Sequence, residues 1–227
     1  MNNQKTFSIT GSIKEAWGLT MDHLLFLVGV TVLVMAFSIA GQVLQGVVDK
    51  SMLSDETAFL VLAIIFLVTF VISTVIKIGI LRIMLRITHG EKPEWGDLVR
   101  DRKLFFRYLF ASILVGIIVM IGFLLLIIPG IIFALALSFF GVHIVDKNAG
   151  ITESLKRSWE LTKGVRLKLL SFFILLGLIN LLGLLALGIG LLITIPLSMV
   201  AQVVVYRKLS SSEMLPLQNS PSIQPAI

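Results

Sequence analysis

Six long apolar stretches dominate the chain and are separated by short or polar segments. They cover Leu24–Val47, Ala58–Ile80, Arg107–Ile128, Gly130–Val145, Leu167–Leu187 and Leu191–Tyr206. About 20 helical residues, each rising 1.5 Å, cross the roughly 30 Å of hydrocarbon in a bilayer. The pattern therefore predicts an all-α polytopic membrane helix bundle, with six transmembrane helices arranged as three hairpins.

The fourth and sixth stretches are slightly short for a crossing. Each holds about sixteen residues, or about 24 Å of helix. Either these hairpins cross fully, with local bilayer thinning and snorkelling by Tyr206 and Arg207, or they are deep re-entrant loops with turns buried in protein. We favour full crossing because the preceding arms, Arg107–Ile128 and Leu167–Leu187, are long enough.

An amphipathic segment is predicted before each hairpin. Ser12–Thr20 (SIKEAWGLT) and Ser154–Thr162 (SLKRSWELT) are nearly the same sequence, with apolar residues at helical spacing. Glu15 follows Ser12 by three residues, as in a capping box. The middle segment, which starts at Pro93, is a weaker candidate because Gly96 disfavours a helix.

The three tryptophans of the chain fall in these three segments. Indole prefers the headgroup level of a bilayer, so Trp17, Trp95 and Trp159 are candidate interfacial anchors. The second and third hairpins also align at an offset of sixty residues. We therefore interpret residues 1–208 as one membrane domain of three pseudo-repeats, at about 8–82, 90–145 and 150–206. The alternative is that apolar segments align by composition alone.

Composition excludes a water-soluble globule. The mean hydropathy is +1.01, and only 14% of the 227 residues are charged, which is too little polar surface for a soluble fold of this size. The chain lacks cysteine, which excludes disulfides and thiolate chemistry. After Leu209 the sequence is polar and contains proline, so a disordered cytoplasmic tail is expected over 209–227.

The distribution of basic residues predicts the orientation. If the N-terminus is cytoplasmic, Lys50 is the one basic residue on the opposite side. The other basic residues then lie on the cytoplasmic side, at Lys5, Lys14, Lys77–Arg107, Lys147–Lys168 and Arg207–Lys208. The positive-inside rule accordingly places both termini in the cytoplasm. The net charge of +6 reflects this topology and gives no reason to expect nucleic acid as a partner.

Few polar residues lie inside the predicted spans. The absence of Asp and Glu there argues against a transporter with a carboxylate relay. Lys77 lies within a span but near enough to its cytoplasmic end to snorkel. The candidate polar lining residues are Gln42, Ser73, Asn180 and Gln202. A carrier would gather these four around one cavity, whereas a scaffold would scatter them.

Catalytic motifs are not found in the sequence. The three histidines are far apart in the sequence, and no metal-ligand spacing, phosphate-binding loop or nucleophile motif occurs. We therefore expect no enzyme activity, metal or cofactor. A basic run mixed with aromatic residues could hold anionic lipid headgroups, although ordinary positive-inside residues at a helix entry are the favoured explanation. Its cations are Arg100, Arg102, Lys103 and Arg107.

A longer motif follows the fourth apolar stretch, and its distinctive positions are Pro129, Gly130, Asp146, Gly150, Glu153, Ser158, Trp159 and Gly164. Over residues 124–205 this pattern resembles the membrane domain attached to some glycerophosphodiester phosphodiesterases and its stand-alone, uncharacterised bacterial relatives. The resemblance implies a six-helix protein of the bacterial cytoplasmic membrane with an unassigned role. It does not imply phosphodiesterase activity, because the given sequence has no soluble catalytic domain.

The sequence thus favours a non-catalytic membrane interaction or envelope-maintenance protein, with membrane lipids and a membrane-protein partner or a second copy of the chain as partners. The alternative is a carrier or channel for a lipid-like or small neutral solute. For the motif, we expect Asp146 and Glu153 to dock the third amphipathic helix, by accepting hydrogen bonds from helix amides or by pairing with basic residues.

Overall fold

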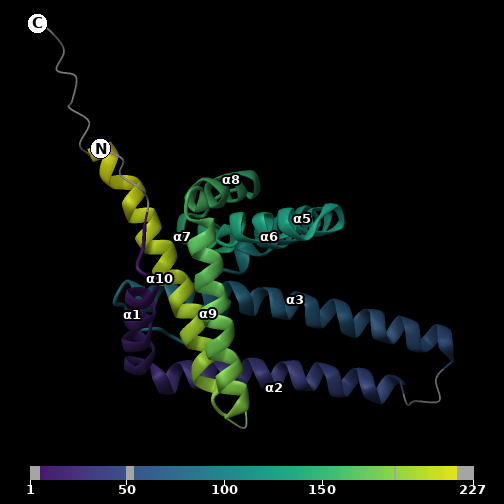
Figure 1. The fold of residues 1–227 in the computed structure, drawn as a ribbon. Coiled ribbons are helices and arrows are strands. Elements are labelled where there is room, and N and C mark those ends of the chain that lie inside the picture. Colours follow the sequence, from purple (N-terminus) through teal and green to yellow (C-terminus); the bar gives the residue numbers. More distant parts are fainter. Residues whose placement is uncertain (1–5, 50–53, 187, 219–227) are drawn as a thin grey trace, which may run out of the picture.

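The computed structural model describes residues 6–49, 54–186 and 188–218, and these residues form helices and turns without a strand (Figure 1). The α-helices are α1 (Ile9–Asp22), α2 (Leu24–Asp49), α3 (Asp55–Thr88), α4 (Asp97–Arg100), α5 (Phe105–Leu125), α6 (Ile127–Ala136), α7 (Phe140–Lys147), α8 (Ile151–Thr162), α9 (Arg166–Leu185) and α10 (Leu191–Gln218). A 3₁₀ turn, Arg102–Leu104, precedes α5.

Within the described part of the chain, six helical segments are long and apolar enough to cross a membrane: Leu24–Val48, Glu56–Thr88, Phe105–Leu125, Ile127–Lys147, Arg166–Leu185 and Leu191–Ser212. Each coincides with one predicted apolar stretch. The predicted all-α membrane helix bundle is therefore confirmed, and the chain is a multi-pass membrane protein.

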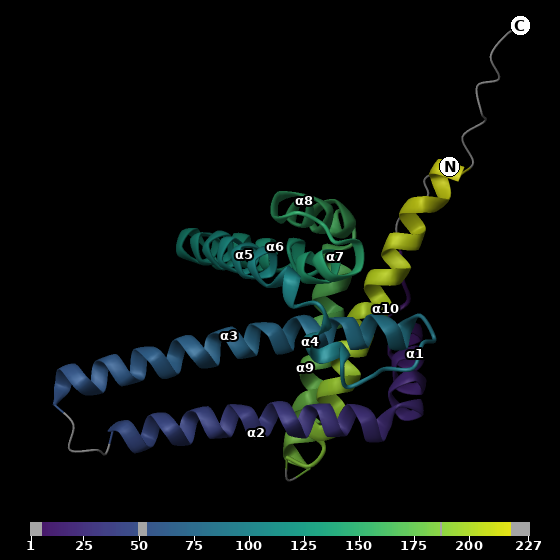
Figure 2. The ribbon, with the colours of Figure 1, turned by 180° about the vertical axis from the view of Figure 1, so that it is seen from behind.

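The hairpins do not run parallel to one another. The α2–α3 hairpin projects away from the rest of the molecule, while α9 and α10 cross it at a steep angle in both views (Figures 1 and 2). Helix α10 makes contacts with α1, α2, α3, α8 and α9. It therefore joins the third hairpin to the first, while α3 directly contacts α5 and α7 of the second.

The core lies where α1, the C-terminal half of α3, α7, α8 and α10 meet. Ile83, Ile87, Ile144, Leu161 and Tyr206 are almost fully buried there. By contrast, the outer parts of α2 and α3 expose large apolar side chains, which in a membrane protein face lipid.

The turn between the third and fourth spans lies earlier than predicted. Leu126 has an extended backbone and separates α5 from α6, whereas the sequence had placed the turn at Ile128–Gly130. Pro129 instead occupies the first turn of α6, where its missing N–H costs no helical hydrogen bond. Gly130 lets α6 approach α5, because a Cβ there would lie 2.5 Å from the Phe123 ring.

Helices form at the first and third segments predicted before the hairpins, and the middle one is only a short turn. α8 lies over its predicted segment, but α1 begins earlier, with Ser8 and not Ser12 as its N-cap, and α4 has just four residues. The Asp97 carboxylate accepts the backbone N–H of Glu94 at 2.9 Å, a local bond that competes with helix formation, and Gly96 disfavours a helix further.

The predicted disordered tail is wrong for residues 209–218, because α10 continues to Gln218. Leu209 is fully buried against the core, and Lys208 pairs with Glu15 of α1 at 2.8 Å. These contacts with α1 stabilise the extra turns. Residues 219–227, the remainder of the predicted tail, lie outside the described part of the chain.

Candidate functional site

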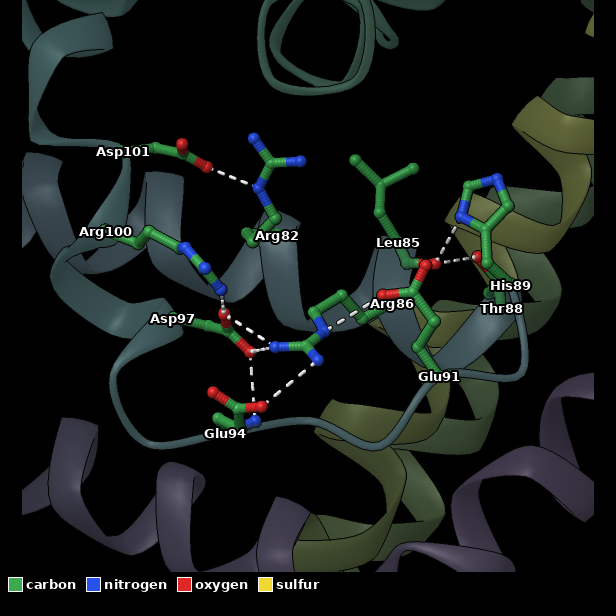
Figure 3. Close-up of polar contacts among 10 residues, drawn as sticks. All are labelled: Arg82, Leu85, Arg86, Thr88, His89, Glu91, Glu94, Asp97, Arg100 and Asp101. Carbon is green, nitrogen blue, oxygen red and sulfur yellow. Dashed lines mark hydrogen bonds and ion pairs between the residues drawn. The ribbon is translucent and has the colours of Figure 1, made fainter.

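The densest group of charged contacts lies at the C-terminal end of α3. We call it the α3 ion-pair network (Figure 3). It consists of Arg82, Arg86, Glu91, Glu94, Asp97, Arg100 and Asp101. Arg82 and Arg86 are four residues apart and so share one face of α3, while all the acidic members come from the segment that follows it.

Asp97 is the centre of the network and is fully buried. Nη1 of Arg86 donates to both carboxylate oxygens, at 3.0 and 2.8 Å, and Arg100 approaches at 3.4 Å. Burial opposes ionisation of Asp97, but the Glu94 N–H and the Arg86 guanidinium outweigh it. The pKa of Asp97 is therefore below its ordinary value, and the carboxylate is ionised at neutral pH.

The remaining ion pairs of the network hold both ends of the segment Glu91–Asp101 against α3. Arg86 also reaches Glu91 at 3.1 Å and Glu94 at 3.3 Å, and Arg82 pairs with Asp101. Gly79 allows the backbone of this segment to lie directly on α3, since a Cβ there would be 2.3 Å from the Leu98 Cα. The connection between the first and second hairpins is thus held rigidly on α3.

This segment places Trp95 on the other arm of the first hairpin. The Trp95 ring lies 4.8 Å from that of Phe26, centroid to centroid, and a Cβ on Gly29 would be 3.0 Å from the indole. Trp95 is nevertheless 53% exposed. The network therefore holds a half-exposed indole against the N-terminal part of α2.

A second polar arrangement joins α8 to the break between α6 and α7. The Ser158 hydroxyl accepts the Phe139 N–H at 3.1 Å and donates to the Ala136 carbonyl at 2.9 Å. Thr162 also donates to that carbonyl, at 3.3 Å. These side chains satisfy backbone groups that the interrupted helix would otherwise leave unpaired.

The other motif positions surround α8. Gly150 precedes it, and the Gly150 N–H contacts Glu153 at 3.5 Å; Glu153 pairs with Arg157 at 2.8 Å. The Arg157 side chain, and to a lesser extent the Gly150 amide, lower the pKa of Glu153. Gly164 follows α8 with φ of +86°, a left-handed conformation that favours glycine.

Asp146 links the second hairpin to the third. Its carboxylate accepts the Tyr206 hydroxyl at 2.8 Å and lies 3.3 Å from Lys147 Nζ. His143 stands edge-on to the Tyr206 ring. Thus Asp146 bonds to a neighbouring hairpin through a tyrosine, whereas the charged partner of Glu153 lies on its own helix.

The candidate tryptophan anchors all lie at the surface of the helix bundle. Trp17 is 49% exposed on α1, and Trp159 is 37% exposed on α8. The guanidinium of Arg166 lies 4.1 Å from the Trp159 ring, and the Phe133 ring is 5.9 Å from it. Each indole therefore keeps a free part of its ring for further contact.

Three of the four candidate polar lining residues bond to groups of their own or a neighbouring helix. Gln42 donates to Ser38 O and Ser73 to Phe70 O, each within its own helix. Asn180 on α9 donates to the Ser198 hydroxyl on α10 at 3.0 Å. Gln202 differs, because it lines a cavity between α3, α5, α7 and α10.

The candidate lipid-binding cations are partly engaged with protein. Arg107 donates to the Asn148 carbonyl at 3.0 Å and its side-chain oxygen at 2.8 Å, while Arg100 contacts Asp97. Lys103 is exposed. The side chain of Arg102 lies outside the described part of the structure. Two of these four cations thus hold segments of the chain together.

Sequence reasoning missed the central members of the α3 ion-pair network and the bond between Asp146 and Tyr206. Arg82 and Arg86 counted only toward the basic cluster, Asp97 was not singled out, and Tyr206 was named only for snorkelling. The available signal was the four-residue spacing of the two arginines, followed by four acidic residues between Glu91 and Asp101. Among the described residues, no group of three or more His, Cys, Asp or Glu is placed to hold a metal ion.

A family model described as "Domain of unknown function (DUF7847)" matches residues 105–222, just over half of the chain. This range contains the α8 motif and begins after the α3 ion-pair network. Neither the curated proteins nor the solved structures contain a match to the chain.

Proposed function

The chain belongs to the DUF7847 family of unknown function, and we propose that it is a non-catalytic membrane interaction or envelope-maintenance protein. The observation that carries this proposal is the scatter of polar side chains in the membrane-spanning helices. Gln42 and Ser73 bond within their own helices, and Asn180 bonds to Ser198. Bonds of this kind stabilise helices and their packing, which supports a structural role for these side chains.

The exposed surface of the segments that precede the hairpins supports an interaction role. It carries Trp17 on α1, Trp95 just before α4 and Trp159 on α8. Aromatic residues are enriched both in protein interfaces and at the membrane surface. We propose that these indoles contact lipid headgroups and a protein partner, which is another membrane protein or a second copy of the chain. The cations proposed to contact anionic headgroups are Arg100, Arg102, Lys103 and Arg107.

We place this surface on the cytoplasmic side of a bacterial inner membrane, with both termini cytoplasmic. The support is the positive-inside distribution of basic residues.

We also propose that the three hairpins are repeats. Gly122 contacts Gly130 in the second hairpin, and Gly183 contacts Gly190 in the third, so both tips rely on close glycine approach at equivalent places.

A carrier for a lipid-like or small neutral solute is the second candidate, and the position of Gln202 in a cavity favours it. Native mass spectrometry of the protein, extracted gently from its own membrane, distinguishes the two. A stoichiometric protein partner without a defined solute is expected. A bound solute, together with solute flux in reconstituted vesicles, would establish the carrier and overturn the proposal.

A further inference from the structure

The cavity that Gln202 lines contains one cation, Lys77, which belongs to the membrane-spanning helix α3. Its walls come from α3, α5, α7 and α10, and its polar members are Lys77, Tyr108 and Gln202. The apolar members are Ile80, Leu81, Met84, Val142, Met199 and Val203. The cavity therefore combines one positive charge and an amide with an apolar wall.

Lys77 has a free charge within the described part of the chain. Its side chain is exposed, and none of the described carboxylates forms an ion pair with it. The nearby acidic residues of the α3 ion-pair network are taken up by Arg82, Arg86 and Arg100. An ionisable group in a membrane-spanning helix normally has a counter-charge. That counter-charge must come from outside the described residues.

The position of Lys77 along α3 indicates where the counter-charge lies. Residues 57–76 contain no charged side chain and span about 30 Å as a helix, the thickness of the hydrocarbon layer. Lys77 directly follows this run, at the level where lipid phosphates begin. A phospholipid headgroup is thus the nearest available anion.

The apolar wall accommodates the lipid beyond its headgroup. Ile80, Leu81 and Met84 lie on the same face of α3 as Lys77, at three-, four- and seven-residue spacing. An apolar cavity next to it shares Ile80, Met84 and Met199 as wall residues. Methionine side chains adapt to irregular apolar ligands. The wall can therefore hold the start of an acyl chain.

We propose that this cavity is a binding site for one anionic phospholipid, with its phosphate on Lys77 and the Gln202 amide and its proximal acyl chain against Met84 and Met199. The site does not depend on whether the protein is a scaffold or a carrier. It differs from the headgroup surface at Arg100–Arg107, since it lies between helices of three hairpins.

The test is native mass spectrometry of the full chain in detergent, titrated with phosphatidylglycerol or with phosphatidylcholine of the same acyl chains. Wild type should bind one phosphatidylglycerol preferentially. Lys77→Gln should weaken that binding by about fivefold, given about 1 kcal/mol per basic residue near a lipid surface. Lys77→Arg should restore it. Lys14→Gln is the matched control, because Lys14 is an exposed cation on α1 outside the cavity.

Equal binding of both lipids, or unchanged binding in Lys77→Gln, would overturn the proposal. A third titration, with oleate, identifies the source of the anion. Lys77-dependent binding of oleate without binding of phosphatidylglycerol would also overturn it, because the occupant would then be a free fatty acid. Should Lys77→Gln fail to fold, Gln202→Leu tests the same site through the amide, and unchanged lipid preference in that variant would count against the site.

Discussion

One nitrogen of Arg86, Nη1, donates to both carboxylate oxygens of the buried Asp97. The two residues come from different elements, α3 and α4, so this contact fixes the position of the segment between the first two hairpins. Because that segment also carries Trp95, the ion pair determines where the indole lies against Phe26.

This ion pair predicts loss of stability in acid. The folded-state pKa of Asp97 is below its ordinary value, so between the two pKa values the unfolded state binds more protons. The stabilisation is complete above about pH 5, beyond the unfolded pKa of about 3.9, and is lost as pH falls through the folded pKa. Thermal unfolding in detergent should show a falling midpoint below about pH 5.

Asp97→Asn should lower the unfolding midpoint by a few degrees at neutral pH, and it should flatten this acid dependence. The reason is that Arg86 then lacks its buried counter-charge. Asp22→Asn is the control, because Asp22 is exposed at the end of α1 and has no ion pair in the described structure. An acid dependence of Asp97→Asn as steep as that of wild type would show that the pair does not contribute.

Ser158→Ala should destabilise the protein by about 1–3 kcal/mol, the usual cost of leaving a buried polar group unpaired. The substitution removes the partner of the Phe139 N–H and one donor to the Ala136 carbonyl. Ser171→Ala is the matched control, since Ser171 is exposed and its hydroxyl bonds only to Leu167 in its own helix. Chemical denaturation of both variants provides the comparison, and equal stabilities would exclude this role for Ser158.

The membrane-spanning helices could be predicted from sequence because each contains an uninterrupted apolar run, and bilayer thickness alone sets its length. The segment that forms α8 was also found, because Ser154–Thr162 nearly repeats Ser12–Thr20 and because its residues carry the resemblance to a known membrane domain. Its role as a cap was not predictable. The break after Ala136 lies within a continuous apolar sequence, and the hydroxyls of Ser158 and Thr162 bond the backbone groups that this break leaves unpaired.

The α3 ion-pair network was missed for a different reason. Positive-inside counting treats Arg82 and Arg86 as interchangeable members of a basic cluster, so their partners are not considered. The end of α10 was missed because Ser210–Ser212 reads as a polar tail, whereas pairing between Lys208 and Glu15 is a contact between residues nearly two hundred positions apart. The composition of one segment cannot reveal contacts with residues so far away in the sequence.

Gly79→Ala should cost about 1–3 kcal/mol, as is typical of overpacking. The added methyl group would lie 2.3 Å from both the Cα and the carbonyl oxygen of Leu98, which are backbone atoms that cannot rotate away. Gly177→Ala is the control, because a Cβ there has no atom within 4 Å. Thermal stability of the two variants in the same detergent should therefore differ, and a Gly79→Ala protein as stable as Gly177→Ala would contradict the close contact between α3 and α4.

The proposed topology predicts which positions an impermeant thiol reagent can reach from outside the cell. Because the chain has no cysteine, each introduced cysteine reports one position. Ile128→Cys and Ile189→Cys, at the exposed tips of the second and third hairpins, should be labelled in intact cells if both hairpins cross fully. Lys14→Cys and Lys156→Cys, exposed on α1 and α8, should be labelled only after the membrane is opened.

The steep crossing of α9–α10 over α2–α3 makes Ile189 the more demanding test (Figure 1). Labelling of Ile128→Cys without Ile189→Cys would mean that the third hairpin is re-entrant, whereas external labelling of Lys14→Cys would reverse the orientation.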